Sequence, residues 1–481
     1  MKCLRLEWEP GRSLADAAAL FAEDSFLLVL DSAGRHRERD SRYSVLTSDP
    51  VAIERLDQAI YGLDPFTRLR DWQRLLRLAV GGGSASSGPV AVPPFCGGIA
   101  GLMSYELGEA FERLPHPPRD ELGTPALLAG LFDWALVQDH LEQTVTAWVL
   151  PLRGLAVDES AAAERLDWIQ RRLRGECCGG LNGKETGRGP GRDLSFPGTL
   201  QRIEPTTAVY SNFSRESYVA AVERVIEYIR AGDIFQANLS QQLHAPWPGT
   251  ALELFQRLRR LNPAPFSGLL QHGDVSVVSA SPERFLKVDV DGRVETRPIK
   301  GTRRRPRSPI ADLFAGDELS ASEKDRSENV MIVDLLRNDL SRSCLRGSVR
   351  VTGLCEIERF ETVLHLVSTV EGRLGEGREI WDLLAGCFPG GSITGAPKIR
   401  AMEIISELEG VVRGAWCGSL FALGALGAFD SSILIRTFTL ADGWLRFPVG
   451  GGVVADSNAL EEYRETLHKA SGMIRALRAE P

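Results

Sequence analysis

The chain has 481 residues, 43% of them hydrophobic, and a formal net charge of −8. A chain of this length can bury a large core, so we expect two or more domains, or one domain with a large companion. The acidic balance argues against a nucleic-acid-binding surface. The N-terminus lacks the apolar segment of a signal peptide, and no run of about 18 apolar residues predicts a membrane span.

The eight cysteines are scattered, with no C-x-x-C pair and no histidine at zinc-site spacing. Free thiols are typical of the reducing cytosol, so we expect a cytoplasmic protein. Two segments, 81–88 and 174–197, are rich in glycine and polar residues and should be mobile. The second segment predicts a boundary that separates an N-terminal region, 1–173, from a C-terminal domain, 213–478, with a glycine-rich linker over 174–212.

The predicted elements differ on the two sides of this boundary. Before it, apolar runs predict strands at 25–32, 125–132 and 144–150, and residues 96–105 form a glycine-rich apolar run. After it, Ser214 can cap a helix over 216–230, and the helix predicted over 322–338 places Val330, Val333 and Leu336 on one side. Irregular alternation of long strands and helices predicts an α+β layered sandwich. Further strands are predicted at 236–243, 267–270, 275–280, 416–421, 431–439 and 444–449, and a last helix at 459–478.

Two acidic pairs lie on predicted helices, Asp325 with Glu328 and Glu462 with Glu465. Residues three apart share a helix face, and any single pair of this kind is usually a solvated surface feature. Here one pair leads into an apolar run and the other follows a glycine cluster. Carboxylates brought together from two helices repel each other unless a cation lies between them, and Mg²⁺ suits ligands that are all oxygen.

Two glycine clusters lie at 389–398 and 450–452. Neither matches the strand-linked G-x-G-x-x-G or the Walker A pattern, so the sequence does not predict nucleotide binding. Glycines in such clusters form tight turns or bring bare backbone N–H groups close to an anion. Their spacing alone does not decide between these two alternatives.

Two basic residues lie in apolar or turn contexts. Arg436 lies in a strand-like run and needs an anionic partner if it faces inward. Lys300 lies between Ile299 and Gly301-Thr302. A surface lysine is the ordinary interpretation, whereas a nucleophilic lysine would need a pKa well below the usual value of about 10.4.

Together these motifs resemble the chorismate-utilising enzymes, which include the large subunits of anthranilate synthase and aminodeoxychorismate synthase, isochorismate synthase and salicylate synthase. The resemblance covers more than half of the chain, from about residue 213 to the C-terminus. So many ordered matches are highly specific. The matching stretches are 231–236, 281–285, 298–302, 325–329, 333–340, 388–398 and 450–457.

The resemblance implies two packed β-sheets flanked by helices. It also implies that Glu328 and Glu465 hold Mg²⁺, which binds a chorismate carboxylate, with Asp325 and Glu462 supporting these ligands. Glu283 is implied as the general acid and base that helps the C4 hydroxyl leave. Other residues are implied to bind the substrate: Arg436, Gly301, Thr302, Gly450, Gly451 and Gly452 at its carboxylates, and His365 and Thr394 near its ring.

Three positions discriminate within the family. Isochorismate and salicylate synthases have a water-activating lysine at the position of Gln236, and an amide cannot act as a base. Aminodeoxychorismate synthases resemble this chain at Lys300, where anthranilate synthases have alanine. In that subfamily the lysine attacks C2 of chorismate as the C4 hydroxyl leaves, and ammonia at C4 then expels the lysine. Trp416 also resembles that subfamily, because anthranilate synthases tend to have tyrosine there.

The N-terminal half resembles the family more weakly, through residues 97–107. Several residues correspond to a pocket that holds tryptophan in some relatives. Asp31-Ser32 departs from the Glu-Ser pair of feedback-regulated anthranilate synthases, so tryptophan binding stays open. The pocket residues are Ser32, Arg42, Tyr43, Ser44, Pro265, Phe266 and Ser267.

No glutaminase nucleophile motif, G-x-C-x-G-x-Q, surrounds any cysteine. The resemblance therefore implies that a separate glutaminase subunit supplies ammonia, and that the chain alone works with ammonium salts. The predicted function is amination of chorismate at C4. The alternatives are an anthranilate synthase large subunit, a non-catalytic regulatory protein that binds chorismate or tryptophan, and a lyase that forms 4-aminobenzoate.

Overall fold

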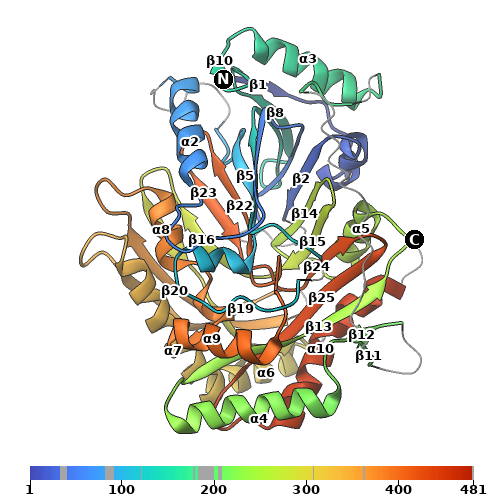
Figure 1. Cartoon of the computed structure of the whole chain (residues 1–481). Coiled ribbons are helices and arrows are strands. Elements are labelled where there is room, and N and C mark those ends of the chain that lie inside the picture. The colour runs from blue at the N-terminus through green and yellow to red at the C-terminus, as the bar shows by residue number, and fades with distance from the viewer. Residues whose placement is uncertain are drawn as a thin grey trace.

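The computed structural model describes residues 1–32, 41–81, 91–120, 122–176, 179–182, 200–203, 208–306, 308–360 and 363–478. Two large β-sheets form the centre of the molecule, and helices cover their outer faces (Figure 1). Neighbouring strands in both sheets pair in the antiparallel direction. This arrangement confirms the predicted α+β class with two packed sheets.

The first sheet joins strands from the beginning, middle and end of the chain. Its β2 (Phe26–Asp31) pairs with β14 (Phe266–His272), which brings the N-terminal strands beside those of the C-terminal half. The strand order is β1 (Lys2–Arg5), β8 (Thr144–Val149), β7 (Trp134–Asp139), β3 (Tyr43–Ser48), β2, β14, β15 (Val275–Ser281), β24 (Thr437–Ala441), β25 (Trp444–Val453), β13 (Gln236–Pro246), β12 (Tyr210–Ser211) and β11 (Gln201–Arg202), with β21 (Gly395–Ala396) beside β13.

The second sheet also mixes the two halves, because β5 (Gly98–Met103) pairs with β22 (Ser419–Gly424). Its order is β18 (Ile299–Arg304), β20 (Val363–Arg373), β17 (Arg293–Thr296), β16 (Arg284–Val288), β23 (Phe429–Ser432), β22, β5, β6 (Leu127–Phe132) and β4 (Ala52–Leu56), with β19 (Arg350–Arg359) beside β20. A short hairpin of β9 (Leu152–Arg153) and β10 (Ala156–Val157) stands apart.

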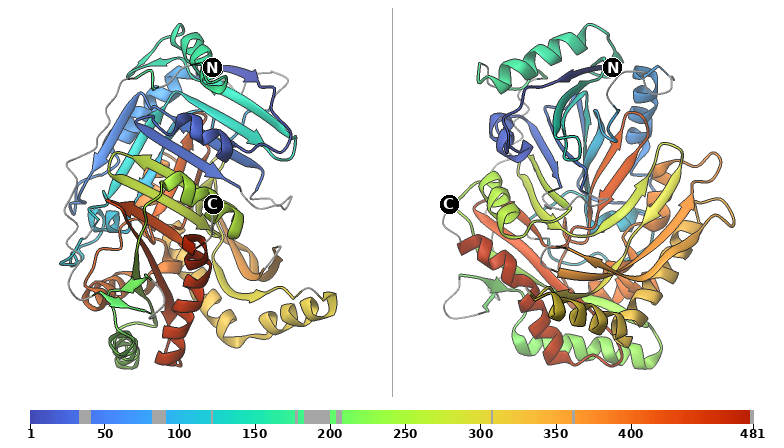
Figure 2. Two further views of the ribbon diagram at one scale, coloured as in Figure 1. Left: turned by 90° about the vertical axis from the view of Figure 1, so that its right-hand side faces the viewer. Right: turned by 180° about the vertical axis from the view of Figure 1, so that it is seen from behind.

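Helices flank both sheets, as the two further views in Figure 2 show. The α-helices are α1 (Leu14–Ala17), α2 (Thr67–Ala79), α3 (Ala161–Leu173), α4 (Arg215–Ala231), α5 (Ala251–Leu261), α6 (Pro309–Ala321), α7 (Glu323–Ser341), α8 (Ile380–Cys387), α9 (Lys398–Glu409) and α10 (Ala459–Arg478). Short 3₁₀ helices are η1 (Ala18–Phe21), η2 (Tyr105–Ala110) and η3 (Gly391–Ile393).

The hydrophobic core follows from the alternation of side chains along the strands. In β2, Phe26 and Leu28 join the core cluster that also contains Ile99 and Leu128 of the second sheet. The intervening Leu27 and Val29 face the other way and pack in a second cluster with Leu254 of α5. One sheet face is therefore buried against the other sheet, and the opposite face is buried beneath helices.

Two predicted helices closely match the structure. The Ser214 hydroxyl accepts a hydrogen bond from Ser217 N at 3.0 Å and so caps α4. The last helix, α10, has the predicted bounds. The prediction for α7 is wrong at Val330, whose exposed fraction is 47%, whereas Val333 and Leu336 are buried.

The predicted strand over 431–439 is also wrong, because it is interrupted at residues 433–436 between β23 and β24. Arg436 has a φ of 51°, a left-handed conformation that a strand residue does not adopt. Gly450–Gly452 belong to the extended β25 rather than to a tight turn. The strand predicted over 416–421 begins only at Ser419.

The predicted mobility of the two glycine-rich segments falls largely on residues 82–90, 177–178 and 183–199, which lie outside the described residues. The boundaries 1–173, 174–212 and 213–478 stay a prediction, although strands from both sides of them share both sheets. In the described part of the chain, no helix combines the length and apolarity needed to cross a membrane.

Candidate active site

Lys300 lies on β18, whose partner β20 carries His365. The ladder is irregular between Lys300 and Thr302, because Gly301 has a φ of 77°. A Cβ atom at Gly301 would lie 2.8 Å from Leu319 of α6 and 2.9 Å from the Asp325 carboxyl carbon of α7. Glycine therefore lets this strand approach both helices closely, and this approach places Lys300 beside the acidic residues of α7.

The Lys300 ammonium group is half-buried and donates a hydrogen bond to the carbonyl of Ser392 at 3.3 Å. Burial lowers the pKa of Lys300, and the nearby carboxylates of Glu328 and Glu283 counteract this effect. A lowered pKa increases the fraction of lysine that is neutral and nucleophilic at neutral pH. The structure thus places the predicted catalytic lysine where its pKa shifts in the required direction.

Glu283 lies between β15 and β16, and its backbone is held on both sides. Its N–H donates to the Ser281 hydroxyl at 3.2 Å, and its carbonyl accepts from Ile433 N at 3.0 Å. Burial raises the pKa of Glu283 to about 7, against the effects of Ser392 and Lys300. A carboxyl group with this pKa can give and take a proton near neutral pH, as a general acid and base must.

The two acidic pairs lie on α7 and α10, and three of the four acids have different partners. Asp325 accepts a hydrogen bond from Arg303 at 3.2 Å, and Glu462 accepts one from the Ser457 hydroxyl at 2.7 Å. Glu465 is exposed and pairs with Lys469 at 2.7 Å. Lys324 of α7 lies 3.8 Å from Glu462 of α10, so the two helices meet at these residues.

The pKa values indicate that these carboxylates influence one another. Burial raises the pKa of Glu328, and the charges of Asp325 and Glu462 raise it further, against Lys300 and Lys324. Burial also tends to raise the pKa of Glu465, but Lys469 lowers it below its ordinary value. Within the described ranges, no group of three or more histidine, cysteine or acidic side chains is placed to hold a metal ion.

The glycine cluster 450–452 lies on β25, opposite residues 238–240 of β13. A Cβ atom at Gly450 would lie 2.5 Å from the Leu239 carbonyl, and one at Gly452 would lie 2.3 Å from the Gln236 amide nitrogen. At Gly451 a Cβ would lie 3.2 Å from the Glu462 carboxylate. Side chains at Gly450 and Gly452 would collide with their neighbours and one at Gly451 would be tight, so glycine leaves a bare backbone beside α10.

Arg436 lies in the irregular segment between β23 and β24, and its carbonyl accepts a hydrogen bond from Ala280 N at 3.1 Å. Its side chain is exposed, and no carboxylate of the described chain pairs with it. Neighbouring protein atoms nevertheless lower the pKa of Arg436 by desolvation. A guanidinium group that reaches solvent, is partly desolvated by neighbouring protein atoms and lacks a carboxylate partner suits an anionic ligand.

His365 is buried on β20, and its Nδ1 lies 2.9 Å from the Thr302 hydroxyl. Burial, and secondarily the charge of Arg436, lowers the pKa of His365 to about 3. The imidazole is therefore neutral at physiological pH. Because Arg436 influences His365, both residues and Thr302 belong to one region of the site.

Thr394, Trp416 and Gln236 are all buried. The Thr394 hydroxyl donates to the Gly390 carbonyl at 3.1 Å, which holds the turn before β21. The Trp416 ring centroid lies 5.0 Å from the guanidinium of Arg413, so this residue packs against a cation in the core. The side-chain amide oxygen of Gln236, Oε1, has no hydrogen-bond partner in the described part of the chain. It can therefore accept a hydrogen bond from a ligand.

The residues of the predicted tryptophan pocket also lie together, and the Arg42 guanidinium lies 4.9 Å from the centroid of the Tyr43 ring. The Ser32 hydroxyl donates to the Tyr43 carbonyl at 2.9 Å, and Ser32 N donates to the Ser44 hydroxyl at 3.1 Å. Pro265–Ser267 lie opposite, because Ser267 pairs with Asp31. Arg42 also forms a salt bridge with Asp139 at 2.8 Å.

Sequence reasoning missed three contributors to the site. Ser392 contacts Lys300, and Lys469 pairs with Glu465 while also donating to the Gly450 carbonyl at 2.9 Å. Arg413 donates to Glu409 at 2.9 and 2.6 Å and so forms a buried ion pair behind β13. The spacing of Glu465 and Lys469, four apart on one helix, was a usable signal. The partners of Ser392 are remote in the sequence.

Comparisons with known proteins identify the family of this chain. Residues 59–475 match the family model described as chorismate binding enzyme. Aminodeoxychorismate synthase component 1 of Salmonella typhimurium is 42% identical over 384 residues, covering 80% of this chain and 77% of that protein. Anthranilate synthase component 1 of Thermus thermophilus is 42% identical over 386 residues, covering 80% of this chain and 78% of that protein.

A solved structure supports the fold. The crystal structure of anthranilate synthase component I from Streptococcus pneumoniae matches with a TM-score of 0.73 and 29% identity. The match covers 92% of this chain and 95% of that one. The predicted chorismate-utilising fold is confirmed, and the chain belongs to the chorismate-binding enzyme family.

Proposed function

We propose that this protein is the chorismate-aminating subunit of an aminodeoxychorismate synthase. It replaces the C4 hydroxyl of chorismate with an amino group and yields 4-amino-4-deoxychorismate, the precursor of 4-aminobenzoate and folate. The observation that carries the proposal is Lys300, whose pKa is lowered by burial beside Glu283, a carboxyl group with a pKa of about 7. This pair supplies a nucleophile and a proton donor at one place.

The proposed reaction has two substitutions. The neutral Lys300 amine attacks C2 of chorismate, the ring double bond shifts, and the C4–O bond breaks as Glu283 protonates the leaving hydroxyl. Ammonia then forms a bond to C4, the double bond shifts back, and the C2–N bond to Lys300 breaks. The protons lost from nitrogen balance those taken up by Glu283 and the released lysine, and water is the second product. The covalent intermediate divides one difficult substitution into two easier ones.

The other site residues position the substrate in this proposal. Arg436 and the bare backbone of Gly450–Gly452 bind carboxylates of chorismate. His365, which stays neutral, and Thr302 lie beside the ring and can donate or accept hydrogen bonds without adding charge. Gln236 offers an amide where a general base would be needed for water addition, so amination is favoured over hydration.

Glu328 and Glu465 hold Mg²⁺ in this proposal, with Asp325 and Glu462 behind them. The residues fit a hard cation, because their donors are oxygens and the neighbouring acids raise the pKa of Glu328. When bound, the ion supplies positive charge for a substrate carboxylate. Lys324 and Lys469 neutralise part of this cluster in the structure.

A metal-ligand variant tests this assignment. Glu328→Gln removes one charged ligand, so we expect a Mg²⁺ requirement shifted to at least about ten-fold higher concentration, together with lower activity. The measurement is the rate of amination as a function of added Mg²⁺ after chelation. Glu323→Gln, at an exposed position of the same helix, is the matched control. Full activity of Glu328→Gln without added metal would refute the assignment.

Ammonia comes from a separate glutaminase subunit in this proposal. The names of the Salmonella and Thermus relatives, component 1, imply a second component in those enzymes. The purified chain should therefore use ammonium salts directly, whereas glutamine should support the reaction only after a glutaminase partner is added.

The first experiment identifies the product. The purified chain is incubated with chorismate, Mg²⁺ and an ammonium salt at mildly alkaline pH. The products are separated by chromatography and identified by mass spectrometry. We expect 4-amino-4-deoxychorismate, which an added lyase converts to 4-aminobenzoate. Anthranilate as the main product would instead support the second candidate, an anthranilate synthase, which the equally similar Thermus relative favours.

A further inference from the structure

A buried ion pair lies beside β13, the strand that pairs with the glycine cluster of β25. Its acid, Glu409, is the last residue of α9, and its base, Arg413, follows in the segment before β22. The two side chains are 1% and 2% exposed, and the guanidinium donates to the carboxylate at 2.9 and 2.6 Å. A buried ion pair is weak evidence for stability, because desolvation of two charges can offset their mutual attraction. The pair is therefore better explained by the groups that it holds.

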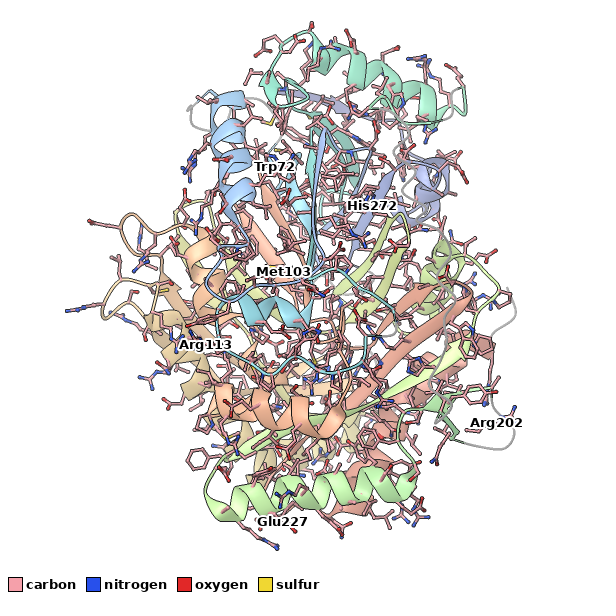
Figure 3. The ribbon with its side chains drawn as sticks, in the orientation of Figure 1. Trp72, Met103, Arg113, Arg202, Glu227 and His272 are labelled. Carbon is pink, nitrogen blue, oxygen red and sulfur yellow. The ribbon has the colours of Figure 1, made fainter. Side chains whose placement is uncertain are left out.

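Several contacts fix the Arg413 side chain in one place. Its backbone N–H donates to the carboxylate of Glu106 on η2 at 2.7 Å. η2 begins two residues after Met103, which Figure 3 labels. The guanidinium lies 4.7 Å from the ring centroid of Tyr105 and 5.0 Å from that of Trp416. Two aromatic rings and a backbone hydrogen bond therefore leave this cation little freedom to move.

The remaining hydrogen bonds of Arg413 reach two backbone carbonyls of the proposed site. One arm of the guanidinium donates to the Asn238 carbonyl of β13 at 2.6 Å, and the other donates to the Ile393 carbonyl of η3 at 3.1 Å. Glu409 is attached to β13 as well, because it accepts from the N–H and the hydroxyl of Ser240, both at 2.8 Å. Both strand residues lie opposite the glycine cluster of β25. The ion pair thus joins η3 to β13.

η3 depends on this connection more than β13 does. β13 pairs with β25 over residues 237–246, so the ladder holds the strand without help from the ion pair. Within η3, the N–H groups of Ile393 and Thr394 donate at 3.4 Å, longer than the usual N–H···O distance of about 2.9–3.0 Å. The Thr394 carbonyl is attached to β13 by a hydrogen bond of 2.7 Å, and Arg413 holds the preceding residue. Loss of this hold should therefore displace η3 first.

Ser392, at the centre of η3, connects this short helix to the reacting groups. Its carbonyl accepts a hydrogen bond from the Lys300 ammonium group at 3.3 Å, and its side chain interacts with the Glu283 carboxyl group. We propose that Arg413, held by Glu409, positions η3 and thereby sets the place of Lys300 in the reaction. Arg413 touches no reacting atom in this proposal and is a positioning residue. The inference rests on the proposed function, because it needs Lys300 to act in amination.

Arg413→Lys is the first test. Lysine keeps a positive charge beside Glu409 but lacks the planar fork that reaches two carbonyls at once. A displacement of about 1 Å in a reacting group can lower a rate by about 10²-fold, so we expect kcat for C4 amination to fall by about 10- to 100-fold. The KM for chorismate should change by less than about three-fold, because β13 and β25 stay paired. Both constants are measured with ammonium and Mg²⁺ in excess.

Arg165→Lys is the matched control. The Arg165 side chain is 3% exposed and pairs with Asp49 and Asp133, each at 2.9 Å. It lies on α3, which Figure 1 shows at the opposite end of the molecule from α9. This change should lower the midpoint of thermal unfolding, as Arg413→Lys does, and leave kcat unchanged. A general loss of stability is thereby separated from a loss of positioning.

A double-mutant cycle tests whether Arg413 acts through Lys300. If it does, Arg413→Lys should change the residual rate of Lys300→Ala by less than about two-fold. An equal loss in both backgrounds, or a kcat that stays at the wild-type value in Arg413→Lys, would overturn the proposal. If Arg413→Lys does not fold, Glu409→Gln takes its place in the same cycle. It weakens the hold on Arg413 without changing the shape of its partner, so kcat should fall by about 3- to 10-fold.

Failure of the proposed function has a different result. A wild-type chain that forms anthranilate, or no aminated product, would overturn C4 amination before any variant is compared. A wild type that forms 4-amino-4-deoxychorismate, with Arg413→Lys and Arg165→Lys equal in kcat, would overturn the positioning role alone.

Discussion

The proposed catalytic site and the region around Asp31 contain similar kinds of charged residues, but these residues are paired differently in the two places. Arg436 has no carboxylate partner among the described residues. Burial lowers the pKa of Lys300 and raises that of Glu283 to about 7. Around Asp31, Arg259 pairs with the carboxylate at 2.5 Å and Ser44 donates to it at 2.8 Å. A charged side chain without an ion-pair partner indicates a ligand site, whereas one that is paired within the protein indicates a structural role.

This contrast makes separate predictions for the two regions. Changes in the proposed catalytic site should reduce the reaction rate with little effect on folding. Changes around Asp31 should reduce stability and leave the reaction unchanged. The largest effect is expected at Lys300 and the smallest at Arg42.

Lys300→Ala removes the proposed nucleophile and the cation beside Glu328. We expect C4 amination to fall by on the order of 10³-fold or more, because the covalent route is lost. The measurement is the rate of 4-amino-4-deoxychorismate formation with ammonium, with all products identified by mass and chromatography. Appearance of the C2-aminated product would sharpen the role of Lys300 in regiochemistry. An unchanged rate and product would refute the covalent role of Lys300.

Glu283→Gln removes the proposed proton donor, and general acid–base catalysis typically contributes about 10²–10⁴-fold. In the wild type the pKa of Glu283 is raised to about 7 by burial, so the acid form predominates below that pH. The step that protonates the leaving hydroxyl should slow as the pH rises through about 7. Free ammonia becomes more abundant over the same range, so the profile must be measured at a constant concentration of neutral ammonia. A profile identical in wild type and variant would exclude Glu283 as the acid.

Much of the catalytic region could be predicted from short-range patterns. The Ser214 cap correctly predicts the start of α4, and the helix predicted over 322–338 correctly places Asp325 and Glu328 on α7. Arg436 was placed in a continuous strand because the apolar run around it is strand-like. Its left-handed φ depends on the Ala280 hydrogen bond to its carbonyl, which comes from a strand about 150 residues earlier and which no local pattern reveals.

The pairing of charged side chains could not be predicted either, because it depends on contacts between segments that are remote in the sequence. Lys300 contacts Ser392, and Asp31 contacts Arg259, through folding that joins remote segments. Val330 shows the opposite error, since its apolar character suggested a buried position that the neighbouring elements do not cover. Composition and spacing identified which residues carry chemistry, but only the fold shows which of them are left without partners.

Asp31→Ala tests the region where charges are satisfied. It leaves Arg259 and Ser44 without their acceptor, so we expect a loss of about 1–3 kcal/mol in the free energy of unfolding. The measurement is urea denaturation, accompanied by the rate of chorismate amination, which should be unchanged. Inhibition of the wild type by added tryptophan that disappears in this variant would contradict the structural interpretation, and would show that Asp31 belongs to a regulatory pocket.

Arg42→Ala should have the smallest effect. Arg42 is 38% exposed at its side chain and pairs with Asp139 at 2.8 Å, not with Asp31. Solvent screens such a pair, so we expect a loss of about 0.2–1 kcal/mol in the free energy of unfolding, decreasing further at high salt. Arg42→Lys keeps the charge and should recover part of the loss. If Arg42→Ala instead alters inhibition by an added amino acid, Arg42 binds a ligand carboxylate despite its pairing with Asp139. Ion pairing would then no longer distinguish a structural region from a ligand site.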